Sequence, residues 1–152
     1  MDKGDKQVLS DIEKFGWHVV IVSPEKEEPG FAFSIGMFKN YGHPEIIIFG
    51  LKNEVMHNVI NSLGEDIKNG KKLATSIEYD NVLDETKCIF VEVEKKNYKE
   101  YLGYALWYYK NIEFPVLQCV WPSKTTGLFP WDKEVAQIVK DYQPALYKMK
   151  SC

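Results

Sequence analysis

The chain contains no arginine: all 19 of its basic residues are lysine, against 22 acidic residues, for a net charge of −3. Without guanidinium groups, the protein lacks the bidentate donors that suit base edges and phosphates. It also lacks the excess of basic charge that nucleic-acid-binding proteins usually carry. We therefore predict no nucleic-acid partner, and any bound phosphate must be held by lysines, hydroxyl groups and backbone N–H groups.

Cysteines and long apolar runs are also scarce. The three cysteines, Cys88, Cys119 and Cys152, lie far apart without a CxxC pair, which argues against a disulfide framework and a structural zinc site. Cys88 and Cys119 lie in apolar runs, so we expect them in the core. Its apolar runs, such as Ile46 to Phe49, are far shorter than the roughly 20 residues that span a bilayer. The charged start MDKGDKQ does not resemble a signal peptide. These features predict a cytoplasmic protein with no membrane partner.

Known catalytic signatures are absent as well. The sequence has no nucleophile elbow, Walker loop, dinucleotide fingerprint or HExxH motif. We therefore assign no catalytic residue and no metal ligand, and we favour a binding protein over an enzyme.

Hydrophobic periodicity predicts the element order α-β-β-β-α-β-β-α-β-α. Four apolar residues at helical spacing, Val8, Leu9, Ile12 and Phe15, form the buried face of the first helix. No repeat, linker or break in composition divides the chain, so we predict one α+β domain over residues 1–152, with a mixed, mostly antiparallel sheet flanked by helices. The predicted helices span residues 5–15, 98–109 and 133–140, and a further helix is capped by Asn53 and ended by Gly70. The predicted strands span residues 17–22, 31–37, 45–50, 73–79, 88–93 and 115–121.

The first candidate site is a strand face made of small residues. In an extended chain Ala32, Ser34 and Gly36 point to the same side, away from Phe31 and Phe33. Small side chains leave room for a ligand on the sheet, and glycine lets the ligand approach the backbone. The alternative is that a helix packs on this face instead.

The second candidate is the segment NYGHPE, which contains His43 and Glu45. Histidine can carry a proton near neutral pH, and a carboxylate two residues away on the same face can orient it. A metal site would need a third ligand, for which His18 is the only other histidine on a strand. The alternative is a Gly-His-Pro turn in which His43 bonds the local backbone.

The third candidate is the loop between Trp121 and Trp131. Lys124, Thr125 and Thr126 offer a charge and hydroxyl groups beside a glycine whose backbone can turn amides toward an anion. The two indoles can stack on a flat ring. The alternative is that both tryptophans fill the core and the polar loop is a solvated turn.

The motifs FAFSIGM, GHPEIIIFGL and QCVWPSKTTGLFPWD, in this order, resemble the family called domain of unknown function 4262. Members carry Thr-Ile-Gly-Leu where this chain has Ser34 to Met37, and often an acid where it has Ser123. The loss of that acid weakens a catalytic role for the loop. The resemblance implies no activity, but the occurrence of the family in bacteria and viruses fits a role in phage defence or its evasion.

The leading hypothesis is a non-catalytic protein that binds a nucleotide-like or other anionic aromatic metabolite and that can form homo-oligomers. An alternative is a flavin reductase using FMN, since the strand pattern faintly resembles split barrels. Another is a protein-interaction module such as an immunity protein, suited by the acidic balance and the aromatic helix. The predicted ligand contacts are Ser34, Gly36, His43, Glu45, Trp121, Lys124, Thr125, Thr126 and Trp131.

Overall fold

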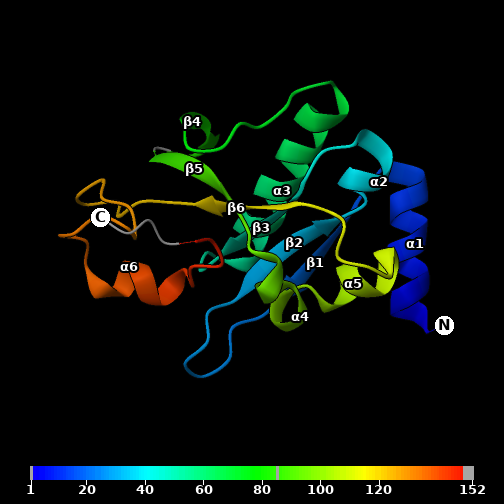
Figure 1. The fold of residues 1–152 in the computed structure, drawn as a ribbon, viewed down its shortest axis with the longest axis horizontal. Helices are drawn as coiled ribbons and strands as arrows, with labels where there is room; N and C mark the ends of the chain where they lie inside the picture. Colours follow the sequence, from blue (N-terminus) through cyan, green and yellow to red (C-terminus); the bar gives the residue numbers. More distant parts are fainter. Residues whose placement is uncertain (1, 85, 149–152) are drawn as a thin grey trace.

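A computed structural model describes residues 2–84 and 86–148, and it shows one six-stranded sheet with helices on both faces (Figure 1). The predicted α+β class is confirmed. Cys152 lies outside the described residues. The strands are β1 (His18–Val22), β2 (Phe31–Ile35), β3 (Glu45–Phe49), β4 (Glu78–Leu83), β5 (Thr86–Glu92) and β6 (Val116–Val120). The α-helices are α1 (Lys3–Phe15), α2 (Met37–Tyr41), α3 (Asn53–Lys68), α4 (Tyr98–Tyr101), α5 (Gly103–Tyr109) and α6 (Gln137–Tyr142), with a 3₁₀ turn at Lys95–Asn97.

The sheet has the order β1-β2-β3-β6-β5-β4 and consists of two antiparallel halves. The halves meet at β3 and β6, which pair in parallel with Glu45 opposite Val116. All five residues of β3 are buried, as expected for a central strand that is apolar on both faces. The sheet stays open and is not closed into a barrel, so the split-barrel architecture is not observed.

Each face of the sheet has its own hydrophobic core. On one face α3 packs on β2 and β3, because its apolar stripe of Met56, Ile60 and Leu63 contacts Ala32 and Ile46. On the other face, α1, α4 and α5 cover the side chains that alternate with these along the strands. A third cluster forms where the C-terminal segment returns to β6. The helices α1 and α6 lie at opposite ends of the long axis (Figure 1).

The main error in the predicted elements lies at residues 36–41. The strand predicted over 31–37 ends at Ile35, and the short helix α2 follows. Gly36 has φ +115°, a left-handed conformation that a strand cannot continue. Alternation of large and small residues fits both a strand and its turn, so this break was not visible in the pattern.

Several other predicted boundaries also differ from the observed ones. The helix predicted over 98–109 is interrupted at Leu102, and the strand predicted over 73–79 lies instead at Glu78–Leu83. Asn53 does not cap α3; its side-chain amide donates to Ser23 Oγ at 3.1 Å, and Lys52 stands at the cap position. The helix predicted over 133–140 begins only at Gln137. Cys88 and Cys119 are buried as expected, and none of the described helices has the length and apolar character needed to cross a membrane.

The contact between Trp17 and α3 gives a test of the packing. The indole donates its N–H to Asn61 Oδ1 at 2.9 Å and covers Gly64. A Cβ at Gly64 would lie 2.5 Å from Trp17 Cε2. Alanine normally stabilises a helix interior relative to glycine by about 0.5–1 kcal/mol, whereas overpacking a core costs about 1–3 kcal/mol.

We therefore expect Gly64→Ala to lower the melting temperature, because the overpacking cost exceeds the helix-propensity gain. The control is Gly103→Ala, since a Cβ there would meet nothing within 4 Å. Thermal unfolding followed by circular dichroism measures both variants. A Gly64→Ala protein as stable as Gly103→Ala would contradict the described packing.

Candidate functional site

The carboxylate of Glu45 lies fully buried at the point where β2, α2 and α5 meet. Ser34 donates its hydroxyl proton to Oε1 at 2.8 Å, and the Tyr109 hydroxyl donates to Oε2. Ser34 Oγ in turn accepts the N–H of Ile46 at 3.0 Å. Burial raises the pKa of the Glu45 carboxyl, and the hydrogen bonds it accepts act in the opposite direction.

The same carboxylate accepts the first backbone N–H groups of α2. The amides of Gly36, Met37 and Phe38 donate to its two oxygens at 3.0, 3.2 and 3.2 Å. These groups have no partner inside a helix, and a negative charge at that end is favourable. Glu45 therefore caps α2 from the neighbouring strand, and the contacts of Ser34, Gly36 and Glu45 are explained by the fold alone.

The small-residue face predicted as a ligand floor is packed by protein. Ala32 is fully buried in the core beneath α3. A Cβ at Gly36 would lie 2.8 Å from the carbonyl oxygen of Gly16 and 3.1 Å from Ile12. These contacts favour the alternative in which helices pack against these small residues, with α3 over Ala32 and the end of α1 beside Gly36.

His43 is held in one neutral form by two backbone groups. Nδ1 lies 2.8 Å from the carbonyl oxygen of Pro44, and Nε2 lies 3.1 Å from the amide nitrogen of Leu73. A carbonyl accepts only from N–H, and an amide donates only to a lone pair, so the proton resides on Nδ1. Burial lowers the pKa of this imidazole, and Lys72 lowers it further, while the bond to Pro44 raises it. The ring therefore joins two loops, and Glu45 does not orient it.

The loop with Lys124, Thr125 and Thr126 closes on itself. Ser123 Oγ pairs with Thr125 Oγ1 at 3.0 Å and accepts the amide of Thr126 at 3.3 Å. The amide of Gly127 donates to the Ser123 carbonyl at 2.8 Å. These N–H groups are used within the turn, while the Lys124 side chain is exposed. Anion binding by this loop stays a prediction.

The two predicted stacking tryptophans pack on different neighbours. Trp121 donates its indole N–H to the Phe49 carbonyl at 2.8 Å, and its backbone N–H and C=O both bond the Gln143 amide. Trp131 is 36% exposed and stacks on Phe129 at a ring separation of 5.1 Å. Trp131 also makes an edge contact with Tyr147, and Trp121 anchors the C-terminal segment.

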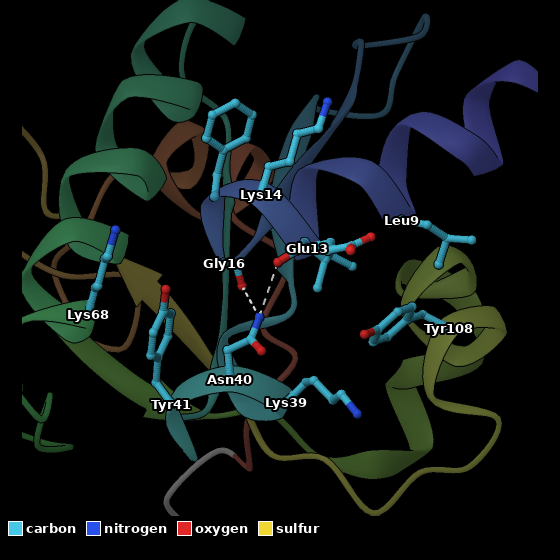
Figure 2. Close-up of a pocket in the computed structure, with 11 residues that line it drawn as sticks. Leu9, Glu13, Lys14, Gly16, Lys39, Asn40, Tyr41, Lys68 and Tyr108 are labelled. Atoms are coloured by element: carbon cyan, nitrogen blue, oxygen red, sulfur yellow. Dashed lines mark hydrogen bonds between the residues drawn. The ribbon is translucent and has the colours of Figure 1, made fainter.

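The side chains around the C-terminal end of α1 form a groove of about 660 Å³ that the sequence motifs did not indicate (Figure 2). Lys14, Lys39 and Lys68 come from three helices, α1, α2 and α3, and surround it together with Tyr41 and Tyr108. The other lining residues are Leu9, Ile12, Glu13, Phe15, Gly16 and Asn40.

The backbone around this groove is fixed by Asn40. Its side-chain amide donates to the carbonyl oxygens of Gly16 at 2.8 Å and of Ile12 at 3.3 Å, so α2 is tied to the C-terminal end of α1 (Figure 2). Gly16 itself ends α1 in a left-handed conformation at φ +105°. The groove therefore rests on a rigid junction between two helices.

Phe15 is the residue of this groove that the sequence misplaced. Its spacing from Ile12 predicted a buried position, yet its side chain is 62% exposed, the largest fraction among the exposed large hydrophobic residues described. The buried residues of α1 are Val8 and Ile12, so the apolar stripe is not covered as far as the last residue of the helix. In the sequence, only Lys14 and Phe15 immediately before Gly16, which ends the helix, could have pointed to this groove.

A scan against family models matches residues 11–136 to the model described as Domain of unknown function (DUF4262). The chain belongs to this family. The match takes in β1 to β6 and nearly all residues that line the groove, including Lys14, Lys39 and Lys68. A search of the curated proteins and a search of the solved structures found no match for this DUF4262 protein. Among the described residues, no cluster of three or more His, Cys, Asp or Glu side chains is placed to hold a metal ion.

The first prediction from this site concerns the bond between Glu45 and Tyr109. Burial and the adjacent carboxylate raise the pKa of the Tyr109 hydroxyl, so it stays protonated and donates. Tyr109→Phe should lower the free energy of unfolding by about 1.5–3 kcal/mol, as expected for a hydrogen bond to a charged group. Glu45→Gln should cost about 3 kcal/mol or more, since an amide NH₂ would face buried donors.

Urea unfolding of both single variants and the double variant tests this coupling. Tyr109→Phe should cost much less when Glu45 is already glutamine. The control is Tyr104→Phe, which removes a hydroxyl that donates to Asp5 at 2.9 Å on the surface. Additive effects of the two buried changes would show that the pair does not stabilise the fold as described.

The second prediction concerns acid stability. Because the folded pKa of His43 is depressed, the unfolded chain takes up a proton more readily, and stability falls as pH drops below the ordinary imidazole pKa of about 6.5. The stability of the wild type relative to His43→Gln should therefore shrink between pH 7.5 and pH 5. Chemical unfolding at both pH values measures it. His57→Gln, at an exposed histidine, should follow the wild type; a constant difference for His43→Gln would refute the assignment.

Proposed function

We propose that this protein binds a small anionic molecule carrying a flat ring, of the nucleotide class, in the groove between α1, α2 and α3. The observation that carries the proposal is that Lys14, Lys39 and Lys68, from three different helices, line one groove together with the exposed side chain of Phe15. The ligand class is the one expected from the sequence, but the proposed site lies at the ends of the helices and not at the strand face, the His43 segment or the loop between Trp121 and Trp131.

The charge of the groove differs in sign from that of the chain. Three lysines line it against one acid, Glu13, whereas the whole chain carries −3. Within the described part of the chain, none of these three lysines forms a salt bridge. An anion in the groove would partly neutralise these positive charges, and each lysine ammonium that reaches it can donate a charge-assisted hydrogen bond.

The aromatic residues supply the second half of the recognition. An exposed phenyl ring forgoes roughly 1.5–3 kcal/mol of burial, which a flat ring lying on it would recover. Tyr41 and Tyr108 border the same groove and are half-buried, so they are already ordered. A volume of about 660 Å³ suits a ligand of nucleotide size, since small-molecule sites commonly measure about 300–1,000 Å³.

The two rival hypotheses find less support. The flavin reductase was inferred from a split barrel, and the described strands form an open sheet. The interaction module was inferred from the acidic balance and the aromatic helix, and Tyr98, Leu102 and Ala105 of that segment are buried against the sheet. A groove with charge and rings placed together favours the small molecule.

The proposal is tested by titrating the protein with the common nucleoside monophosphates, with the matching nucleosides and with inorganic phosphate. At least one nucleotide should bind more tightly than either of its parts, and its affinity should fall with added salt. Each of Lys14→Gln, Lys39→Gln and Lys68→Gln should weaken binding by about 3- to 5-fold, because a partly exposed ion pair is worth up to about 1 kcal/mol. Isothermal titration calorimetry provides the affinities.

Two controls make the test specific. Lys133→Gln removes the same charge from an exposed position on the segment that leads into α6, and it should leave binding unchanged. Phe15→Leu keeps an apolar side chain but removes the ring, and it should weaken the nucleotide by roughly 5-fold or more, as expected for a lost stack. Equal losses for Lys133 and the three groove lysines, or no nucleotide binding at all, would overturn the proposal.

A further inference from the structure

Beside the groove lies a histidine bonded to a carboxylate. His18, the first residue of β1, places Nδ1 2.7 Å from Asp11 Oδ2 on α1. The other oxygen of Asp11 accepts the side-chain amide of Gln7 at 2.7 Å, so the carboxylate is itself held in place. The two side chains are only 19% and 21% exposed. A carboxylate on Nδ1 keeps the proton there and leaves the Nε2 lone pair as the basic position.

The unused edge of His18 borders a second cavity. This cavity measures about 410 Å³ and shares Lys14, Phe15 and Lys68 with the lysine groove. Within the described ranges, Nε2 of His18 has no hydrogen-bond partner. Lys14 and Lys68 therefore line the same cavity as a histidine that a carboxylate orients, and such a carboxylate–histidine pair is a common device of acid–base catalysis.

The remaining histidine of this cavity lacks these features. His57 is exposed on α3, and its nearest polar neighbour is the amide nitrogen of Asn61, at 3.3 Å from Nδ1 and 3.5 Å from Nε2. Asn61 is already engaged by the indole of Trp17. No carboxylate among the described residues fixes the proton of His57. The cavity therefore holds one oriented imidazole, His18, and one without such a partner, His57, with which it can be compared.

We propose that His18, positioned by Asp11, is the general base of a phosphate-ester hydrolase whose substrate belongs to the anionic aromatic class of the lysine groove. The inference rests on the proposed function. Nε2 takes a proton from water while the water oxygen forms a bond to phosphorus. The bond from phosphorus to the ester oxygen breaks, that oxygen takes a proton from solvent, and Nε2 returns its proton to solvent, so water is consumed and an alcohol and a phosphate are released.

The lysines supply the electrostatic part of this reaction. Negative charge moves onto the phosphoryl and leaving oxygens as the ester bond breaks, and Lys14 and Lys68 line both cavities where that charge develops. Phe15 lines both cavities, so its exposed ring is available to the ring of the ester. Asp11 is a positioning residue, because it touches His18 and not the substrate.

The experiment uses bis(4-nitrophenyl) phosphate, an anionic aromatic diester that releases a yellow phenolate on hydrolysis. The wild type should hydrolyse it above the rate in buffer. His18→Gln should lower kcat by 100-fold or more, within the range of general-base catalysis, while binding of the diester persists. Asp11→Asn should lower kcat with little change in KM, and Asp11→Glu should restore part of the loss.

Two comparisons separate a catalytic base from a structural ion pair. His57→Gln should keep the wild-type rate, although it alters the same cavity. Added imidazole should raise the rate of a His18→Gly protein, because a free base can occupy the space left by the side chain. A folded His18→Gln protein with full activity, or a His18→Gly protein that imidazole does not rescue, would overturn the proposal.

Binding and turnover fail in different ways. If calorimetry shows the diester bound in a lysine-dependent manner and no phenolate forms, the hydrolase is excluded and the binding proposal stands. If neither the diester nor any nucleotide binds, both proposals fall. Turnover that survives in His18→Gln but falls in the lysine variants would assign the activity to another base and likewise overturn the role of His18.

Discussion

The buried carboxylate of Glu45 is the interaction on which the arrangement of this end of the fold depends. Glu45 is the first residue of the central strand β3. Its carboxylate caps α2, which precedes it in the chain, and accepts a hydrogen bond from Tyr109 of α5, which follows much later. A buried charge is costly unless donors surround it, and five groups do so here. Removing any one element would leave donors or charge unpaired, so β2, β3, α2 and α5 are ordered together.

The architecture was readable in the sequence because it follows from periodicity. Strand β3 is buried on both faces and reads as an uninterrupted apolar run, while α3 shows a regular apolar stripe. The helix α2 was missed because it has five residues and follows a left-handed glycine, and its first amides are satisfied by Glu45 from seven to nine residues away. Such a cap depends on tertiary contact and leaves no local pattern.

The site was less predictable for the same reason. His43 and Glu45 are polar residues close together in the chain and were predicted as ligand contacts, yet both form hydrogen bonds with backbone groups. The groove lysines at positions 14, 39 and 68 are separated by more than twenty residues each and look like ordinary surface charges. Only the packing of three helix ends against one edge of the sheet brings them together. Composition indicated which donors the protein had for an anion, but it could not indicate where they meet.

The parallel pairing of β3 with β6 also shapes how the chain reaches this structure. Each half of the sheet is a set of local antiparallel pairings, but the seam joins residues about 70 positions apart. Closing so long a loop is slow relative to forming hairpins, because its entropy is lost before the contact is gained. During synthesis β3, with its Ile-Ile-Ile run, therefore waits as an unprotected edge until β6 has been made. The strand that best stabilises the finished protein is also the segment most prone to join a second, unfinished chain.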